Sequence, residues 1–139
     1  SEFTIILMKY PNAVVTLNTA FYYYGLSKRA PEKYYLATER GTSAIRDPRV
    51  VQIFENSGKL HLGEVKAEHN DRSFRIYDKE RMLVELLRHK NQFPFEYYKE
   101  ILLNYRQMIH GLDIPRIYDY IYELPKSKMV KNAFRLEVL

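Results

Sequence analysis

The stretch from Asp78 to Lys90 constrains the fold most, because its two ends and its interior all carry helix signals. Asp78 can accept hydrogen bonds from the first free backbone N–H groups, and the basic residues 88–90 complement the helix dipole at the other end. Apolar residues recur at helical spacing along one side: Met82, Leu83, Leu86 and Leu87. The spacing therefore predicts an amphipathic helix that packs this side against a core.

The charged residues of this segment are expected on the solvent side of the helix, and they are Glu80, Arg81, Glu85 and Arg88. Val84 is expected at the margin of the apolar side. Arg81 and Glu85 stand four residues apart and can pair. An exposed pair of this kind stabilises a helix by only about 0.3–0.5 kcal/mol. Periodicity alone thus indicates an ordinary core helix.

Bulk composition favours one small domain that lies outside the membrane. The chain has 139 residues, of which 46% are apolar, so it can bury one good core. No apolar run reaches the roughly 18–20 residues of a membrane span, and we expect a cytoplasmic protein without a leader. The absence of cysteine excludes disulfides, thiolate zinc sites and a cysteine nucleophile.

The charge balance is mildly basic, with 22 Lys and Arg against 17 Asp and Glu and a net charge of +5. This bias is compatible with nucleic acid or with an acidic protein partner, and it selects neither. The 13 tyrosines suit a surface that is apolar in body and wet at the tip, which indicates an interface.

The order of local signals predicts an α+β fold, in which a small antiparallel or mixed sheet of short strands is packed by amphipathic helices and followed by a helical C-terminal part. Residues 1–3 are interpreted as a cloning remnant, and residues 4–139 as one domain. A helix or strand is expected at 5–10, and strands at 34–38, 50–54, 60–67 and 73–77. Helices are expected at 14–26, where Gly25 is a left-handed cap, and at 94–111, 114–124 and 126–139.

Most catalytic signatures are missing, so we expect neither an enzyme nor a bound cofactor. No glycines have the spacing of a phosphate loop, no nucleophile elbow occurs, and the four histidines lack the spacing of metal ligands. One weak pattern remains, because Asp47, Glu55 and the Glu64-x-Lys66 pair follow the acidic, acidic-x-Lys order of nucleases that hold Mg²⁺. A Mg²⁺-dependent nuclease therefore stays open as an alternative.

Two phrases carry a resemblance to a known family. The first is Asp-x-Glu-Arg-x-Leu-x-Glu-Leu-Leu-Arg over residues 78–88, and the second combines Tyr10-Pro11-x-Ala13-Val14 with the helix that ends in Gly25-Leu26-Ser27. Together they resemble the AbiEi-like antitoxins, which are transcriptional regulators of abortive-infection (type IV toxin–antitoxin) operons and act in phage defence. The family usually has Thr at the position of Met82 and Asp at that of Glu85.

The resemblance implies a division of labour between two domains. In the family, an N-terminal winged-helix domain binds operator DNA, and a C-terminal domain counters a nucleotidyltransferase-like toxin and supports repression of the operon. We expect this chain to hold the C-terminal domain only, with operator DNA bound by a domain outside it. The cognate toxin is the implied partner, and stable contact with it is not required.

Two sets of residues are candidate sites. The motif set is Asp78, Glu80, Arg81 and Glu85. The second set is a candidate surface for a protein partner or nucleic acid, and it comprises Lys28, Arg29, Arg40, Lys126, Lys128, Lys131 and Arg135. A freestanding nucleic-acid-binding domain is the other alternative that these basic residues leave open.

Overall fold

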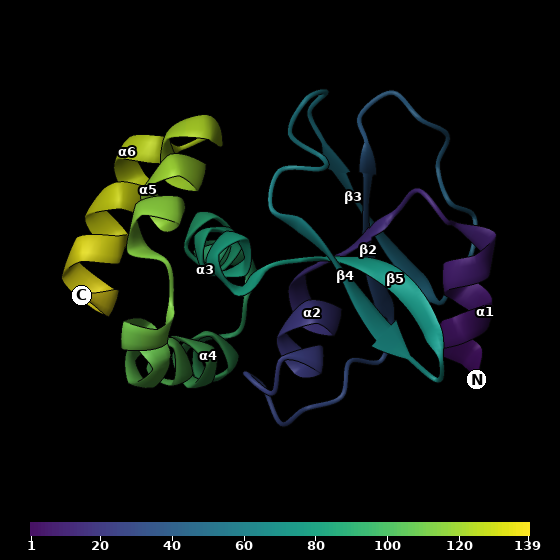
Figure 1. Cartoon of the computed structure of the whole chain (residues 1–139), viewed down its shortest axis with the longest axis horizontal. Coiled ribbons are helices and arrows are strands. Elements are labelled where there is room, and N and C mark those ends of the chain that lie inside the picture. The colour runs from purple at the N-terminus through teal and green to yellow at the C-terminus, as the bar shows by residue number, and fades with distance from the viewer.

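The computed structural model describes residues 1–139 and consists of a sheet half and a helical half that lie side by side (Figure 1). The sheet half holds α1 (Glu2–Lys9), β1 (Val14–Val15), α2 (Leu17–Tyr23), β2 (Tyr34–Glu39), β3 (Val50–Glu55), β4 (Glu64–His69) and β5 (Arg72–Tyr77). The helical half holds α3 (Lys79–Arg88), α4 (Phe95–Met108), α5 (Ile114–Glu123) and α6 (Ser127–Ala133), with a π-helical turn at Phe134–Val138. The predicted α+β fold with a helical C-terminal part is confirmed.

The five strands form one mixed sheet in the order β3-β2-β1-β5-β4. The pairs β1–β5 and β2–β3 are parallel, whereas β1–β2 and β4–β5 are antiparallel. A two-residue turn joins β4 to β5, and its residues Asn70 and Asp71 have φ of 50° and 64°. Positive φ at both central residues is typical of a type I′ turn, whose twist matches that of a hairpin.

The predicted helix at 14–26 is wrong at its start and right at its end. Val14 and Val15 form the central strand β1, because these buried β-branched residues pair with β2 on one side and β5 on the other. The helix then begins at Leu17 and is closed by Gly25, whose φ is +72°. Leu26 N–H donates to the carbonyl of Phe21 at 2.9 Å, which completes a Schellman motif.

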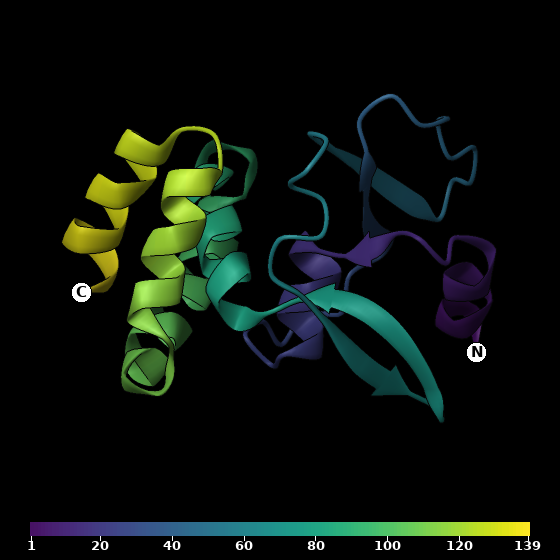
Figure 2. The ribbon, with the colours of Figure 1, turned by 45° about the horizontal axis from the view of Figure 1, so that its top comes forward.

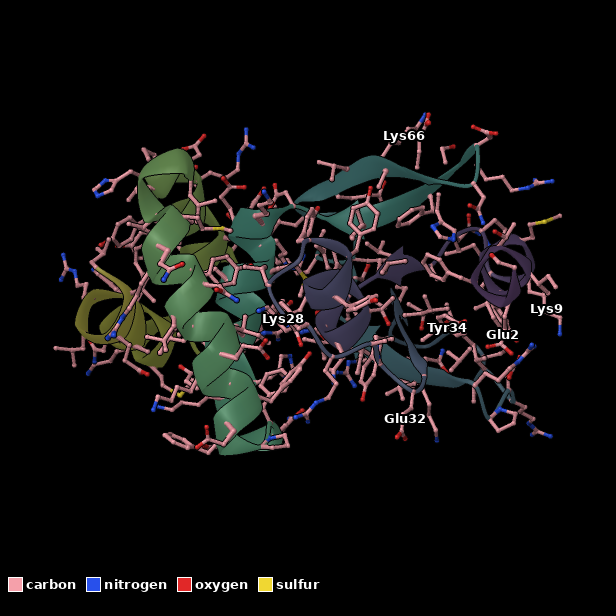
Figure 3. All side chains as sticks on the ribbon, turned by 90° about the horizontal axis from the view of Figure 1, so that it is seen from below. Glu2, Lys9, Lys28, Glu32, Tyr34 and Lys66 are labelled. Carbon is pink, nitrogen blue, oxygen red and sulfur yellow. The ribbon has the colours of Figure 1, made fainter.

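Two other boundaries differ from the prediction. The segment expected to be a strand from residue 60 forms turns up to Gly63, and β4 begins at Glu64. At the amino end, the element expected at 5–10 is the helix α1, which begins at Glu2, and the ring of Phe3 stacks on Tyr34 at 5.3 Å. Figure 3 shows Glu2 beside Tyr34, whose hydroxyl donates to it at 3.0 Å.

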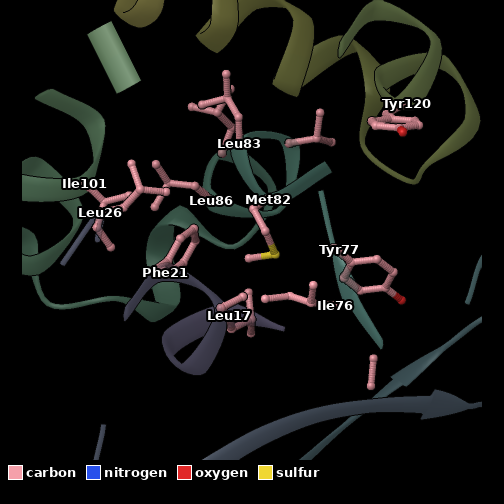
Figure 4. Close-up of a cluster of buried hydrophobic side chains, with 14 of the residues drawn as sticks. Leu17, Phe21, Leu26, Ile76, Tyr77, Met82, Leu83, Leu86, Ile101 and Tyr120 are labelled. Atoms are coloured by element: carbon pink, nitrogen blue, oxygen red, sulfur yellow. The ribbon is translucent and has the colours of Figure 1, made fainter. Parts of the chain in front are cut away.

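One hydrophobic cluster of 31 buried residues runs through both halves. The helix α3 lies between the sheet half and the other helices (Figures 1 and 2), so its two sides belong to the same core. In Figure 4, Leu17 and Ile76 of the sheet half face Met82 of α3, and Leu86 continues toward Ile101 of α4. No helix in the structure is long and apolar enough to cross a membrane.

The predicted helix from Asp78 is confirmed, but its predicted solvent side is wrong. Asp78 is the N-cap and accepts the N–H of Arg81 at 2.7 Å. Every residue from Arg81 to Leu87 is buried, with Arg81 at 0% and Glu85 at 1% exposure. The charged side is covered because the turn after β3 and the other helices enclose α3, so the pair between Arg81 and Glu85 is not a surface pair.

Candidate functional site

A buried cluster of alternating charges joins α3 to the end of β3. Arg81 donates from Nε and Nη2 to Glu85 Oε1 at 3.0 and 2.9 Å. Arg88 donates to Glu85 Oε2 at 2.8 Å and to Glu55 Oε1 at 2.9 Å, and Arg81 Nη2 lies 3.6 Å from Glu55 Oε2. Two acids and two bases thus neutralise one another in a largely buried site, and such pairing is the condition under which buried charges are tolerated.

The remaining N–H groups of Arg81 hold the turn between β3 and β4. Its Nη1 donates to the carbonyls of Lys59 and Leu62 at 2.8 and 2.6 Å. The guanidinium also lies over the ring of Tyr77, with 4.0 Å from Cζ to the ring centroid. Because a guanidinium carries five donors in a planar fork, one Arg side chain can bind a carboxylate and two carbonyls together. Arg81 therefore ties the sheet half to α3.

The protein shifts the pKa values of the two carboxylates of the cluster in opposite directions. Burial raises the pKa of Glu55, and the neighbouring charge of Glu85 raises it further, against the effect of Arg88. Burial also acts to raise the pKa of Glu85, but its contacts with His89, Arg81 and Arg88 outweigh burial and lower the pKa. Glu85 is therefore the main counter-ion of the two arginines.

The other two motif residues fix α5 against α3. Asp78 Oδ2 accepts the hydroxyl of Tyr120 at 2.6 Å, and burial is the main cause that raises the pKa of Asp78. Glu80 accepts the backbone N–H of Asp113, the N-cap of α5, at 2.9 Å. Each of the four motif side chains therefore binds a group of this chain, and what the motif does chemically is to hold elements together.

The predicted basic surface is not one surface. Lys28 and Arg29 follow α2, and Figure 3 shows Lys28 beside α4. Arg40 follows β2 and donates to Asn56 at 2.9 Å. The remaining four residues lie on α6 and the turn after it, and we name them the basic tail: Lys126, Lys128, Lys131 and Arg135.

Tyrosines of α5 accompany the basic tail. The rings of Tyr118 and Tyr122 stack with 6.4 Å between centroids, and Lys131 Nζ lies 5.3 Å from the centroid of the Tyr122 ring. Tyr122 is 60% exposed, so the pair of aromatic rings and the cations share a solvent-facing surface. This arrangement of exposed aromatic and basic side chains suits a partner that carries negative charge.

The acidic residues of the nuclease pattern each have a basic side chain of this chain as a partner. Asp47 binds Arg49 at 2.8 Å, Glu55 belongs to the buried cluster, and Glu64 lies 2.7 Å from His61. No group of three or more His, Asp or Glu side chains lies close enough together to hold a metal ion. The pattern in the sequence is thus not assembled into a set of carboxylate ligands.

Sequence reasoning missed Glu55, Gly63 and Tyr120 as parts of the buried cluster and its surroundings. Glu55 was considered only in the nuclease pattern, yet it is 5% exposed and binds Arg88. Gly63 has φ of +82°, and a Cβ there would lie 2.9 Å from Arg81 Cβ. A glycine just before an extended segment was the only local signal, since the partners lie far away in the chain.

Comparison with models of known protein families gives no match, and neither does comparison with curated proteins. The family resemblance therefore stays a prediction that rests on the residues of the two phrases.

Proposed function

We propose that this chain is the C-terminal domain of an AbiEi-like antitoxin and transcriptional regulator, which opposes a nucleotidyltransferase-like toxin without catalysis and supports repression of its operon. The observation that carries the proposal is the packing of the two phrases against each other. Tyr24, in the phrase that ends at Ser27, donates its hydroxyl to the carbonyl of Tyr77 at 2.7 Å, just before the phrase over residues 78–88 begins. The hydroxyl of Thr16 lies 3.8 Å from Met82 Sδ in the same core.

The two departures from the family pattern within residues 78–88 fit a structural role for the motif. Met82 is fully buried and fills the core beside Thr16, where an apolar side chain packs well. Glu85 keeps the carboxylate that neutralises Arg81 and Arg88. A motif that holds the fold together leaves opposition to the toxin to exposed side chains.

The basic tail, with Tyr122, is the exposed surface to which we assign the antitoxin contact. Its four cations stand on one terminal segment, and Glu137, the one acid of that segment, is bound to Lys90 at 3.2 Å. Their charge is therefore available to an acidic surface of the toxin. Removing exposed charges costs little stability, so the surface can be tested without unfolding the domain.

The test is rescue of growth on co-expression with the nucleotidyltransferase-like toxin encoded beside the regulator. We expect the complete regulator to restore growth, and we expect reversal of the basic tail (Lys126→Glu, Lys128→Glu, Lys131→Glu, Arg135→Glu) to weaken rescue. A matched control reverses four other exposed cations (Arg29→Glu, Lys33→Glu, Arg40→Glu, Lys99→Glu) and should leave rescue intact. Lack of rescue by the unaltered regulator contradicts the function, and equal rescue by both variants contradicts the assigned surface.

A further inference from the structure

Two adjoining hollows lie on the sheet half, on the side away from the basic tail. The first, of about 520 Å³, lies between α1 and the β4–β5 hairpin. The second, of about 560 Å³, lies between the segment that follows α1 and the loop at residues 42–46. Both are lined by Tyr10, Pro11, Ala13 and Arg75, so they form one continuous depression, which we name the sheet-side groove.

The sheet-side groove is strongly basic. Lys66 and Arg72 line the first hollow, Lys9 and Arg46 line the second, and Arg75 lines both. The acids among the lining residues are Asp71 in the first hollow and Glu39 in the second. Figure 3 shows Lys9 and Lys66 projecting from the sheet half, far from α6.

The cations of the groove are not neutralised by the chain. Of the five, only Arg75 lies within 4 Å of a carboxylate, at 3.8 Å from Glu64, and this separation is long for an ion pair. Arginines elsewhere differ, because Arg49, Arg81 and Arg88 bind carboxylates at 2.8–2.9 Å. Clustered like charges repel one another, so a concave group of unpaired cations favours an anionic ligand.

The shape and the lining restrict the class of anion. Two hollows that share Arg75 require a ligand with several negative groups in a row, and a phosphate fits the fork of an arginine. We propose that the sheet-side groove binds the phosphodiester backbone of nucleic acid. This site goes beyond the proposed function, in which operator DNA is bound by a domain outside this chain, and it does not depend on the toxin.

The contact is made to phosphates and not to base edges. Gln52 is the only Gln in the groove, and its side chain is already bound to Thr38 at 2.8 Å and to the N–H of Ile45 at 2.7 Å. Asn12 is the other amide of the groove, and the five cations outnumber the two amides, so contacts to phosphates dominate. Binding should therefore be insensitive to base sequence and strongly sensitive to salt.

The test is fluorescence anisotropy of the full chain with labelled duplexes of about 20 base pairs, in DNA and RNA forms and in two unrelated sequences. The groove variant carries Lys9→Gln, Arg46→Gln, Lys66→Gln and Arg72→Gln. The matched control carries Lys126→Gln, Lys128→Gln, Lys131→Gln and Arg135→Gln, so both variants lower the net charge from +5 by the same amount. None of the four groove residues makes a side-chain hydrogen bond or ion pair, and thermal unfolding will verify that each variant is folded.

We expect the groove variant to bind at least about tenfold more weakly at low salt and to have a shallower salt dependence, and the tail variant to change affinity less than about threefold. The DNA and RNA arms show which backbone the groove prefers, and either preference agrees with phosphate binding. Equal losses in the two variants would mean that net charge alone attracts the duplex and would overturn the proposal. Absence of binding by the unaltered chain, or binding to only one of the two sequences, would overturn it as well.

Discussion

The guanidinium of Arg81 lies over the ring of Tyr77, 4.0 Å from Cζ to the centroid, and the two side chains bind successive parts of the same turn. Tyr77 donates its hydroxyl to the carbonyl of Leu60 at 2.6 Å, between the carbonyls of Lys59 and Leu62 that Arg81 binds. A turn without regular structure thus has three of its carbonyls satisfied by one stacked pair. Through these contacts, β5 and α3 together hold the segment between β3 and β4 in place.

Tyr77→Phe is expected to lower the free energy of unfolding by about 1–2 kcal/mol, because the carbonyl of Leu60 loses its buried donor. The ring stays in place over Arg81, so the fold should be kept. Urea unfolding followed by circular dichroism measures the change. Tyr22→Phe, at an exposed tyrosine of α2, is the control and should be neutral. An equally small effect at both tyrosines would show that the hydrogen bond does not stabilise the turn.

Arg81→Lys keeps the positive charge, but it should lower the free energy of unfolding by at least about 3 kcal/mol. A lysine has three donors on one atom, so it cannot bind Glu85 and the carbonyls of Lys59 and Leu62 together. The same replacement at Arg116, whose side chain is 51% exposed, provides the control and should cost less than about 0.5 kcal/mol. Urea midpoints of the two variants decide the question, and similar midpoints would refute a structural role of the buried guanidinium.

The two carboxylates of the cluster should respond differently to removal of charge. The folded protein lowers the pKa of Glu85, so ionised Glu85 contributes stability above its unfolded value of 4.5, and this contribution is lost as pH falls below 4.5. The folded protein raises the pKa of Glu55, so ionisation of Glu55 costs stability above pH 4.5. Glu85→Gln should therefore lower the free energy of unfolding more than Glu55→Gln does at pH 7. The difference between the two losses should become smaller as pH falls below 4.5.

The measurement is urea unfolding of both variants and the unaltered chain at several pH values between about 3 and 7. Each substitution keeps the shape of the side chain and removes only the charge, so the two variants control for one another. Greater destabilisation by Glu55→Gln than by Glu85→Gln at pH 7 would show that Glu55, and not Glu85, is the principal counter-ion of the arginines.

Local signals predicted most elements because they depend on neighbouring residues. Asp78 caps α3, Gly25 closes α2, and the apolar spacing of α3 correctly predicts its buried side chains Met82, Leu83, Leu86 and Leu87. The strand at Val14–Val15 could not be predicted in the same way. Two residues are too few for an alternating pattern, and their strand exists only because β2 and β5 lie on either side.

The buried cluster could not be predicted from helical periodicity. Periodicity places charged residues on the solvent side of a helix unless their partners elsewhere in the chain are known. Arg81 and Glu85 are neutralised inside the protein by Glu55 and Arg88, and Glu55 lies 26 positions before Arg81. The sheet-side groove could not be predicted for a related reason. Its cations come from α1, the loop after β2 and the β4–β5 hairpin, so no single stretch of sequence is conspicuously basic.

Gly63→Ala tests how closely the turn approaches α3. Gly63 and Gly58 have the same φ of +82°, but a Cβ at Gly58 would meet no atom within 4 Å, whereas one at Gly63 would lie 2.9 Å from Arg81 Cβ and 3.1 Å from the ring of Tyr120. Gly58→Ala should therefore cost only the left-handed backbone strain, about 1–2 kcal/mol. Gly63→Ala should cost about 1–3 kcal/mol more, because the clash displaces side chains at the centre of the cluster. Urea unfolding of the two variants isolates this difference, and equal costs would show that α3 can move away from the turn.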